Sequence, residues 1–119
     1  MSGALYDGRR FRPAATSPAG QAGTDTLFEY RQDGPVVWAT YRGGAVAMGT
    51  LVGTADRGGV LDLRYAHVDR DGVLRAGVCH TVPERLPDGR LRLHETWRWT
   101  EGAGAAGSAG TSTLDEVDG

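Results

Sequence analysis

Short runs of alternating apolar and polar side chains follow one another along this chain, separated by turn signals. The turns are marked by the pairs Gly34-Pro35, Gly43-Gly44, Gly58-Gly59, Asp71-Gly72 and Asp88-Gly89. Asp-Gly and Gly-Gly pairs supply the positive φ angles that tight hairpins require, and no window shows the periodicity of an amphipathic helix. The pattern predicts strands at about 5–12, 24–32, 35–42, 45–55, 60–69, 73–82, 90–101 and 111–117.

Eight strands in chain order predict an all-β fold. The expected architecture is a single eight-stranded antiparallel up-and-down (meander) barrel of the calycin or lipocalin type, because closure removes the exposed edges of a sheet. A chain of 119 residues is a usual length for one domain, here 1–119. Segments rich in Gly, Ala and Pro at about 13–23 and 102–110 are expected to be flexible.

Composition argues against several classes of function. Thirteen basic and fifteen acidic residues leave a net charge of −2, which disfavours binding to nucleic acid or to an anionic membrane. No apolar stretch approaches the ~18–20 residues of a membrane span, and no apolar signal segment opens the chain, so we expect a cytoplasmic protein. A single cysteine, Cys79, and three histidines on different predicted faces argue against a metal site. Gly102 to Gly107 matches GxGxxG, but no helix is predicted after it, so no cofactor is expected.

Turn length sets which residues face each other across a hairpin. Three-residue loops at 57–59, 70–72 and 87–89 predict the facing pairs Gly49 with His67, Leu51 with Tyr65, Leu63 with Cys79, Tyr65 with Gly77, His67 with Arg75, Gly77 with Trp99, Cys79 with Trp97 and Thr81 with Glu95. The shorter turns at Gly34 and at Gly43-Gly44 predict Trp38 opposite both Phe28 and Gly49.

These pairs place one set of residues inside the barrel, namely Phe28, Tyr30, Trp38, Gly49, Leu51, Gly53, Leu61, Leu63, Tyr65, His67, Gly77, Cys79, Leu93, Trp97 and Trp99. Glycines opposite large rings either make room for them in a filled core or widen an aromatic-walled cavity, and eight strands can hold one small ligand. In a cavity, the ligand-binding residues would be Tyr30, Trp38, Leu51, Tyr65, Arg75, Cys79, Trp97 and Trp99.

The same register leaves an apolar set on the outer surface, namely Val37, Tyr41, Val46, Met48 and Val52. An exposed patch of this kind is typical of a protein interface or of a surface that a loop covers. The two predictions for this surface are therefore a homodimer interface and contact with a covering loop.

Two polar side chains, His67 and Arg75, are predicted near one rim of the barrel. The simplest role for Arg75 is a rim ion pair with Glu101. His67 is either a hydrogen-bonded residue at the barrel end or a proton donor or orienting group beside Tyr65 and Trp38 at the mouth of a cavity.

Glu95 is predicted among apolar neighbours, where a carboxylate needs a partner or is protonated by desolvation. Arg10 or Arg12 on the first strand is the expected partner, and without one Glu95 is a candidate general acid/base or ligand anchor. Cys79 has no predicted base beside it, which favours a packed, inert thiol over a nucleophile. The candidate catalytic residues are His67, Glu95 and Tyr65.

Several motifs extend along the chain from Tyr6 to Val117, among them Phe28-x-Tyr30-x-Gln32, Trp38-Ala-Thr-Tyr41-x-Gly43-Gly44, Leu61-Asp-x-Arg64-Tyr65-x-His67 and Leu93-His94-Glu95-x-Trp97-x-Trp99. Together they resemble a family of small bacterial proteins labelled "n-acetylglutamate synthase". The label implies an acetyltransferase, without established catalytic residues to carry over. The predicted barrel itself resembles calycins such as lipocalins and avidins.

Two classes of function follow. The first is a barrel that binds a small apolar or aromatic metabolite against Trp38, Tyr65, Trp97 and Trp99. The second is an isomerase or cyclase of a small metabolite, in which the aromatic walls impose a reactive conformation and His67, Tyr65 or Glu95 moves a proton. A filled barrel that acts as a dimer through its outer patch is a third prediction.

Overall fold

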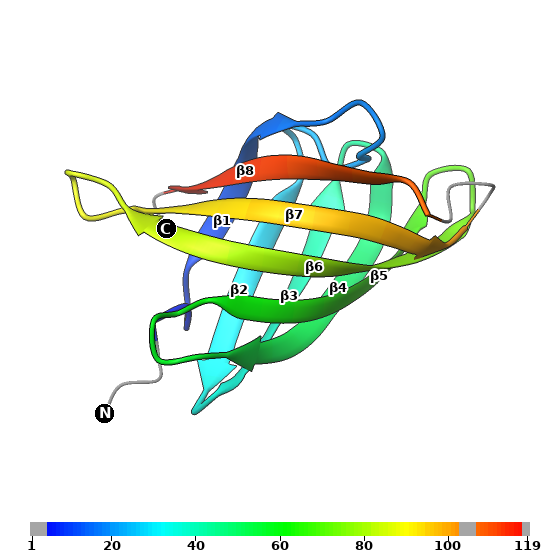
Figure 1. The fold of residues 1–119 in the computed structure, drawn as a ribbon. Coiled ribbons are helices and arrows are strands. Elements are labelled where there is room, and N and C mark those ends of the chain that lie inside the picture. Colours follow the sequence, from blue (N-terminus) through cyan, green and yellow to red (C-terminus); the bar gives the residue numbers. More distant parts are fainter. Residues whose placement is uncertain (1–4, 103–106, 118–119) are drawn as a thin grey trace.

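Eight antiparallel strands follow one another in chain order and close into a barrel (Figure 1). The computed structural model describes residues 5–102 and 107–117. The strands are β1 (Arg10–Thr16), β2 (Leu27–Asp33), β3 (Val36–Gly43), β4 (Val46–Ala55), β5 (Leu61–Asp69), β6 (Leu74–Arg85), β7 (Leu91–Glu101) and β8 (Ala109–Val117). Pairing of β1 with β8 closes the sheet, so the predicted meander barrel is confirmed. The described part of the chain contains no helix that could cross a membrane.

The predicted register is confirmed from β4 to β7. Backbone hydrogen bonds close the three-residue loops between Asp56 and Val60, between Asp69 and Val73, and between Leu86 and Arg90. Asp56 and Asp69 also stabilise their loops, because Oδ1 of each accepts hydrogen bonds from the backbone two and four residues further on. All the facing pairs predicted from these three loops are present.

Strand β3 presents the opposite face from the one predicted. Trp38 faces Arg31 and Val52 instead of Phe28 and Gly49, a displacement of three positions in each hairpin. An odd displacement moves every side chain of a strand to the other face of the sheet. Trp38 therefore lies on the outer surface, where it is 40% exposed, and its predicted place inside the barrel is wrong.

The cause lies in the two turns that flank β3. Only Gly34 and Pro35 separate the paired residues Asp33 and Val36. On the other side, the ladder between β3 and β4 shifts register between Tyr41 and Gly43, so that Gly43 pairs with Val46. A bulge of this kind adds one residue to one strand and changes the register beyond it.

The first strand also differs from its predicted bounds. β1 starts at Arg10 and continues through Pro13 to Thr16, which places part of the segment expected to be flexible in the sheet. A loop of residues 17–26 then leads to β2. In the second segment, β8 begins at Ala109, and residues 103–106 lie outside the described residues.

One end of the barrel interior is filled by side chains. We call it the packed end; it carries the β2–β3, β4–β5 and β6–β7 turns. The hydroxyl of Tyr6 donates a hydrogen bond to the carbonyl of Gly59, and its ring centroid lies 5.8 Å from that of Tyr30. The ring of Phe11 packs edge-on against Tyr30 at 5.2 Å. Completely buried aliphatic side chains surround these rings, namely Val37, Leu61, Leu91, Leu93 and Leu114.

The apolar outer surface differs in part from the predicted one. Met48 and Val52 are exposed as predicted, whereas the remaining members of the predicted set, Val37, Tyr41 and Val46, are buried in the interior. The exposed large apolar side chains of the described residues are Val36, Trp38, Met48, Val52, Val68, Leu74 and Val82. A homodimer through this patch stays a prediction.

Candidate ligand-binding site

The other half of the barrel interior contains a cavity that is partly open to the outside. It lies toward the loop end, which carries the β1–β2, β3–β4 and β5–β6 connections. The space in this cavity that the centre of a water molecule can occupy is about 60 Å³. One water needs ~15 Å³ of such space, so the cavity has room for several. It therefore has room for a small, ring-sized molecule. Its lining comprises Thr16, Gly20, Gln21, Ala22, Phe28, Tyr41, Leu51, Leu63, Tyr65, His67, Cys79, Glu95, Trp97, Trp99 and Ser112.

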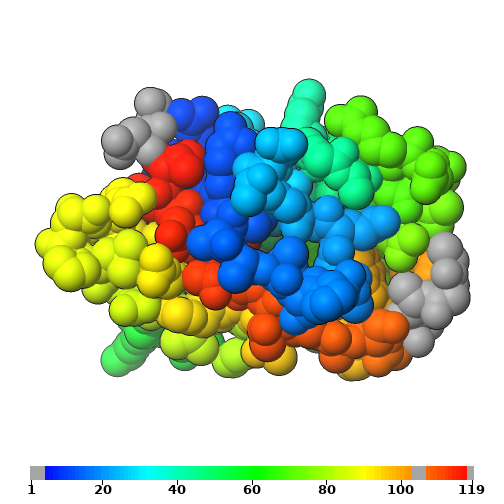
Figure 2. Space-filling view, turned by 90° about the horizontal axis from the view of Figure 1, so that it is seen from above, coloured from blue at the N-terminus to red at the C-terminus, as the bar shows by residue number. Residues whose placement is uncertain are grey.

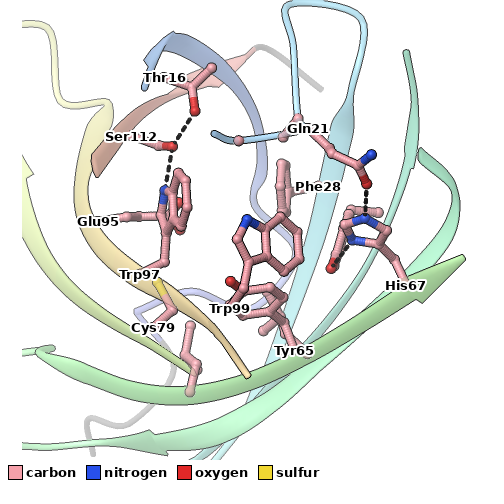
Figure 3. A pocket seen from close by; sticks show the side chains of 15 residues that line it. Thr16, Gln21, Phe28, Tyr65, His67, Cys79, Glu95, Trp97, Trp99 and Ser112 are labelled. Atoms are coloured by element: carbon pink, nitrogen blue, oxygen red, sulfur yellow. Dashed lines mark hydrogen bonds between the residues drawn. The ribbon is translucent and has the colours of Figure 1, made fainter. Parts of the chain in front are cut away.

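Five aromatic rings form much of the wall. Phe28 and Tyr41 stack with centroids 4.7 Å apart. Trp99 packs edge-on against Tyr65 at 5.4 Å and against Trp97 at 5.9 Å. Edge-to-face and stacked contacts of this kind favour fixed ring orientations, so the wall presents a preorganised apolar surface (Figure 3).

Two interior glycines make room for these rings. A Cβ at Gly77 would overlap the ring of Tyr65, and a Cβ at Gly49 would overlap the ring of Tyr41 and lie 2.8 Å from Cβ of His67. The predicted relation between Gly77 and Tyr65 is confirmed. At Gly49 the neighbouring ring is that of Tyr41 and not that of Trp38, because β3 presents its other face.

The loop of residues 17–26 covers one side of the cavity. Three of its residues, Gly20, Gln21 and Ala22, belong to the lining. The indole Nε1 of Trp99 donates a 3.0 Å hydrogen bond to the carbonyl of Ala19, which ties the loop to β7. Figure 2 shows the loop, in blue, lying across this face of the molecule. We refer to residues 17–26 as the covering loop.

His67 connects the covering loop to the aromatic wall. Nε2 of Gln21 donates to Oδ2 of Asp69 at 3.1 Å, so Oε1 of Gln21 faces His67 and accepts a hydrogen bond from its Nε2 at 2.7 Å. Nδ1 of His67 is then the acceptor for the hydroxyl of Tyr41, 3.0 Å away. Burial, and next the positive charge of Arg75, lower the pKa of His67 to about 4. The imidazole is neutral at pH 7 and both ring nitrogens are occupied, which fits the predicted role of a hydrogen-bonded residue at the barrel end.

Arg75 has a different partner from the one predicted. Its Nε donates a 2.9 Å hydrogen bond to Oδ2 of Asp69 on β5, and the predicted pair with Glu101 is not the one the structure shows. Backbone N–H groups in the β5–β6 turn, with Gln21 and Arg75, hold the pKa of the Asp69 carboxyl well below its usual range. Arg75 lies outside the lining, with its guanidinium 5.7 Å from the ring centroid of Trp99. Its contacts near the site are with Trp99 and Asp69.

Glu95 points into the cavity from the middle of β7 (Figure 3). The predicted partners Arg10 and Arg12 flank the buried Phe11 on β1, so both arginines lie toward the outer face, and this predicted pair is wrong. The Glu95 carboxyl makes no hydrogen bond or ion pair with any described residue. Although the cavity gives it partial solvent access, surrounding protein atoms desolvate it and raise its pKa to about 8. Glu95 is therefore largely protonated at pH 7.

Two hydroxyl groups, of Ser112 and Thr16, share the cavity lining with Glu95. Ser112 faces Glu95 across the β7–β8 ladder. Its Oγ accepts a 2.8 Å hydrogen bond from Nε1 of Trp97 and lies 2.7 Å from Oγ1 of Thr16. The hydrogen bond between Ser112 and Thr16 uses one of their two hydroxyl protons, so the other remains available to a molecule in the cavity.

Cys79 and Tyr65 lie in the lining, but neither is set up for proton transfer at neutral pH. The Cys79 thiol is buried with its Sγ 3.6 Å from Oγ1 of Thr81, and burial raises its pKa, which fits an inert, packed thiol. Burial also raises the pKa of Tyr65 above its ordinary value. Of the three candidate catalytic residues, Glu95 alone has a pKa close to neutrality.

The predicted site residues include seven of the fifteen residues that line the cavity and miss a distinct part of it. Leu51, Tyr65, Cys79, Trp97 and Trp99 line the cavity as predicted, whereas Tyr30 lies under it at the packed end. The site residues that were missed are Phe28, Tyr41, Leu63, Thr16, Ser112 and the covering loop at Gly20–Ala22. Phe28 and Leu63 were on the predicted inner face and could have been included from that signal.

A family model described as "Avidin-like protein" matches residues 4–117. The chain belongs to the avidin-like protein family. The predicted resemblance to calycin-type barrels is thereby confirmed at the level of the family. Searches of the curated proteins and of the solved structures found no match. In this avidin-like barrel, no group of three or more His, Cys, Asp or Glu side chains among the described residues is placed to hold a metal ion.

Proposed function

We propose that this avidin-like barrel binds one small apolar or aromatic molecule in the cavity at its loop end. The observation that carries the proposal is the partly open, aromatic-walled cavity itself. Five aromatic rings surround an unfilled space, and a loop anchored by side-chain hydrogen bonds lies over it. Pockets of this kind, largely apolar with a few polar groups, are typical small-molecule sites. Membership in the avidin-like family supports a small-molecule-binding barrel.

The rings of Trp97, Trp99 and Tyr65 are the principal contact surfaces in this proposal. Leu51 and Cys79 form part of the apolar floor. Because the rings are already held by contacts with one another, little conformational entropy is lost in ordering them when a ligand binds, which favours affinity.

Binding of a neutral aromatic probe tests this function. Benzyl alcohol, observed by ligand-detected NMR, should bind the wild-type protein, and Trp99→Ala should weaken binding at least tenfold. Trp38→Ala is the matched control, because Trp38 lies on the outer surface, and it should leave the affinity unchanged. If neither benzyl alcohol nor a panel of other small neutral aromatics binds the folded wild-type protein, the proposed function is wrong.

A second candidate function is an isomerase or cyclase that uses the same cavity. The observation in its favour is the Glu95 carboxyl, whose pKa of about 8 suits a general acid or base at neutral pH. An enzyme of this kind would catalyse deuterium exchange into a bound metabolite in heavy water, and Glu95→Gln would abolish the exchange while the barrel stays folded. Exchange at equal rates in both proteins would exclude Glu95 as the proton carrier. Acetyl transfer and a cytoplasmic location stay predictions from the sequence.

A further inference from the structure

The carboxyl group of Glu95 stands out among the polar groups of the cavity because it has no partner. Its strand neighbours on the inner face are Leu93 and Trp97, and it faces Thr81 and Ser112 across the two adjoining ladders. None of the described residues gives it a hydrogen bond or an ion pair. A carboxyl that is desolvated and unpaired costs free energy unless something else satisfies it.

The remaining lining provides no positive charge to neutralise it. The lining contains no Lys or Arg. Arg75 is held at the rim by Asp69, and His67 is neutral. The titratable groups that influence or surround Glu95 are Tyr30 on β2, Tyr41 on β3, Tyr65 on β5 and Cys79 on β6, all of them raised in pKa and uncharged at pH 7. An ionised Glu95 would thus leave the cavity with one uncompensated negative charge.

The walls around this carboxyl suit a cation. The electron-rich faces of Trp, Tyr and Phe attract organic cations, and an aromatic enclosure is a recurrent way of recognising ammonium groups. Here five rings surround the space into which Glu95 points.

We propose that the ligand of this cavity is a small aromatic or alicyclic amine, bound as its ammonium ion with the positive charge against Glu95. This inference rests on the proposed binding function and specifies its ligand class. The ring of the ligand packs among Trp97, Trp99 and Tyr65, and the ammonium group donates hydrogen bonds to the carboxylate. An anionic ligand would find no cation in the lining to offset its own charge and would oppose ionisation of Glu95.

Binding then releases a proton. The free protein holds Glu95 mostly as the neutral acid at pH 7, and the ammonium ion stabilises the carboxylate form. The acid proton leaves Glu95 for the solvent while the amine keeps its own. With a pKa of about 8 in the free protein, close to one proton, roughly 0.9, should be released for each amine bound at pH 7.

Three probes of nearly equal size test the proposal, namely benzylamine, benzyl alcohol and benzoate. Titration calorimetry should give an affinity for benzylamine at least tenfold higher than for benzyl alcohol, and weaker binding still for benzoate. Repeating the benzylamine titration in two buffers with different ionisation enthalpies measures the proton release. Glu95→Gln should bring benzylamine and benzyl alcohol to similar affinities and abolish the release. Glu101→Gln, a matched change of an exposed carboxyl on the same strand, should change neither.

The outcomes separate this inference from the function on which it rests. If benzyl alcohol binds the wild-type protein as tightly as benzylamine does, or if Glu95→Gln leaves their ratio unchanged, the amine proposal is overturned while the binding function stands. If benzylamine binds without proton release and Glu95→Gln retains its affinity, Glu95 is not its counter-ion and the proposal is equally overturned. If none of the three probes and no compound of the neutral aromatic panel binds, both proposals fail. A thermal unfolding curve of Glu95→Gln confirms that the variant is folded.

Discussion

Gln21 and His67, forty-six positions apart in the sequence, are joined by a 2.7 Å hydrogen bond between Oε1 and Nε2. The bond ties the covering loop to β5 at the edge of the cavity. Through Nδ1, the same imidazole accepts the hydroxyl of Tyr41, so one neutral histidine links the loop, the aromatic wall and the rim.

Gln21→Ala should loosen the covering loop without unfolding the barrel. The variant removes the amide that bridges Nε2–H of His67 and Oδ2 of Asp69. Loss of these hydrogen bonds should lower the stability of the closed loop by about 1–3 kcal/mol. Hydrogen exchange followed by NMR should show faster exchange of the Ser17 and Gly20 amides, which are hydrogen-bonded in the folded protein. Thr24→Ala, at an exposed position of the same loop, is the control. Unchanged exchange in Gln21→Ala would show that its amide does not hold the loop.

Stability should fall as the pH rises through neutrality, and Glu95 should be the cause. Its pKa is raised from an ordinary value of 4.5 to about 8, so the folded state holds a proton that the unfolded chain releases. This stabilisation is complete below pH 4.5 and is lost as the pH approaches and passes 8. Between pH 6.5 and 8.5, Tm should decline in the wild type and in Glu101→Gln, and much less in Glu95→Gln.

The contribution of His67 to folding stability changes with pH in the opposite direction and over a different pH range. Its pKa is lowered from 6.5 to about 4, so the unfolded chain takes up a proton that the folded state refuses. The corresponding stability is present above pH 6.5 and is lost as the pH falls toward 4. Above pH 6.5 this contribution is therefore nearly independent of pH. A wild-type decline there that persists undiminished in Glu95→Gln would contradict the assignment to Glu95.

Alanine at the interior glycines should destabilise the barrel. The added methyl group at Gly77 collides with the ring of Tyr65, and at Gly49 with the ring of Tyr41. Overpacking of this kind costs about 1–3 kcal/mol, measurable as a lower free energy of unfolding in urea. Gly23 is the matched control, because a Cβ there meets nothing within 4 Å and its φ is ordinary. Gly23→Ala should be neutral or stabilise by up to ~1 kcal/mol; equal losses at all three positions would argue against steric crowding.

The three tryptophans should differ in their access to solvent. Trp38 is 40% exposed, whereas Trp97 is 7% and Trp99 is 3% exposed. Trp38→Phe should therefore remove most of the acrylamide quenching of intrinsic fluorescence, and Trp97→Phe should remove little. Strong quenching that survives in Trp38→Phe would place Trp38 inside the barrel, as the sequence register predicted.

The error at Trp38 had a visible counter-signal in the sequence. Placing Trp38 inside also places Thr40 and Arg42 inside, whereas the alternative face of the same strand carries Val37, Ala39 and Tyr41. The hydrophobic alternation thus favoured the face that the structure shows. Assumed turn lengths at Gly34 and at Gly43-Gly44 outweighed it, and a bulge near Gly43 cannot be read from residue types alone.

Local chemistry in the sequence determined the barrel and much of its inner face. Gly and Asp at the turns, and the alternation of apolar and polar residues between the turns, specify antiparallel hairpins. Three of these hairpins have Asp or Leu before a three-residue loop, and they fixed the facing pairs from β4 to β7. Those pairs already brought Tyr65, Trp97 and Trp99 to one surface.

Only the tertiary structure decided how the two ends of the interior differ and which polar groups are paired. The Tyr6 contact with Gly59 fills one end, and the covering loop closes over the other through Gln21. Both contacts join residues far apart in the chain, so no local pattern encodes them. The unpaired state of Glu95 has the same origin, because it depends on which way the arginines of β1 point once the barrel closes. Glu95, for which the sequence predicted only an energetic cost of burial, is thereby an unpaired, titratable carboxyl in the cavity.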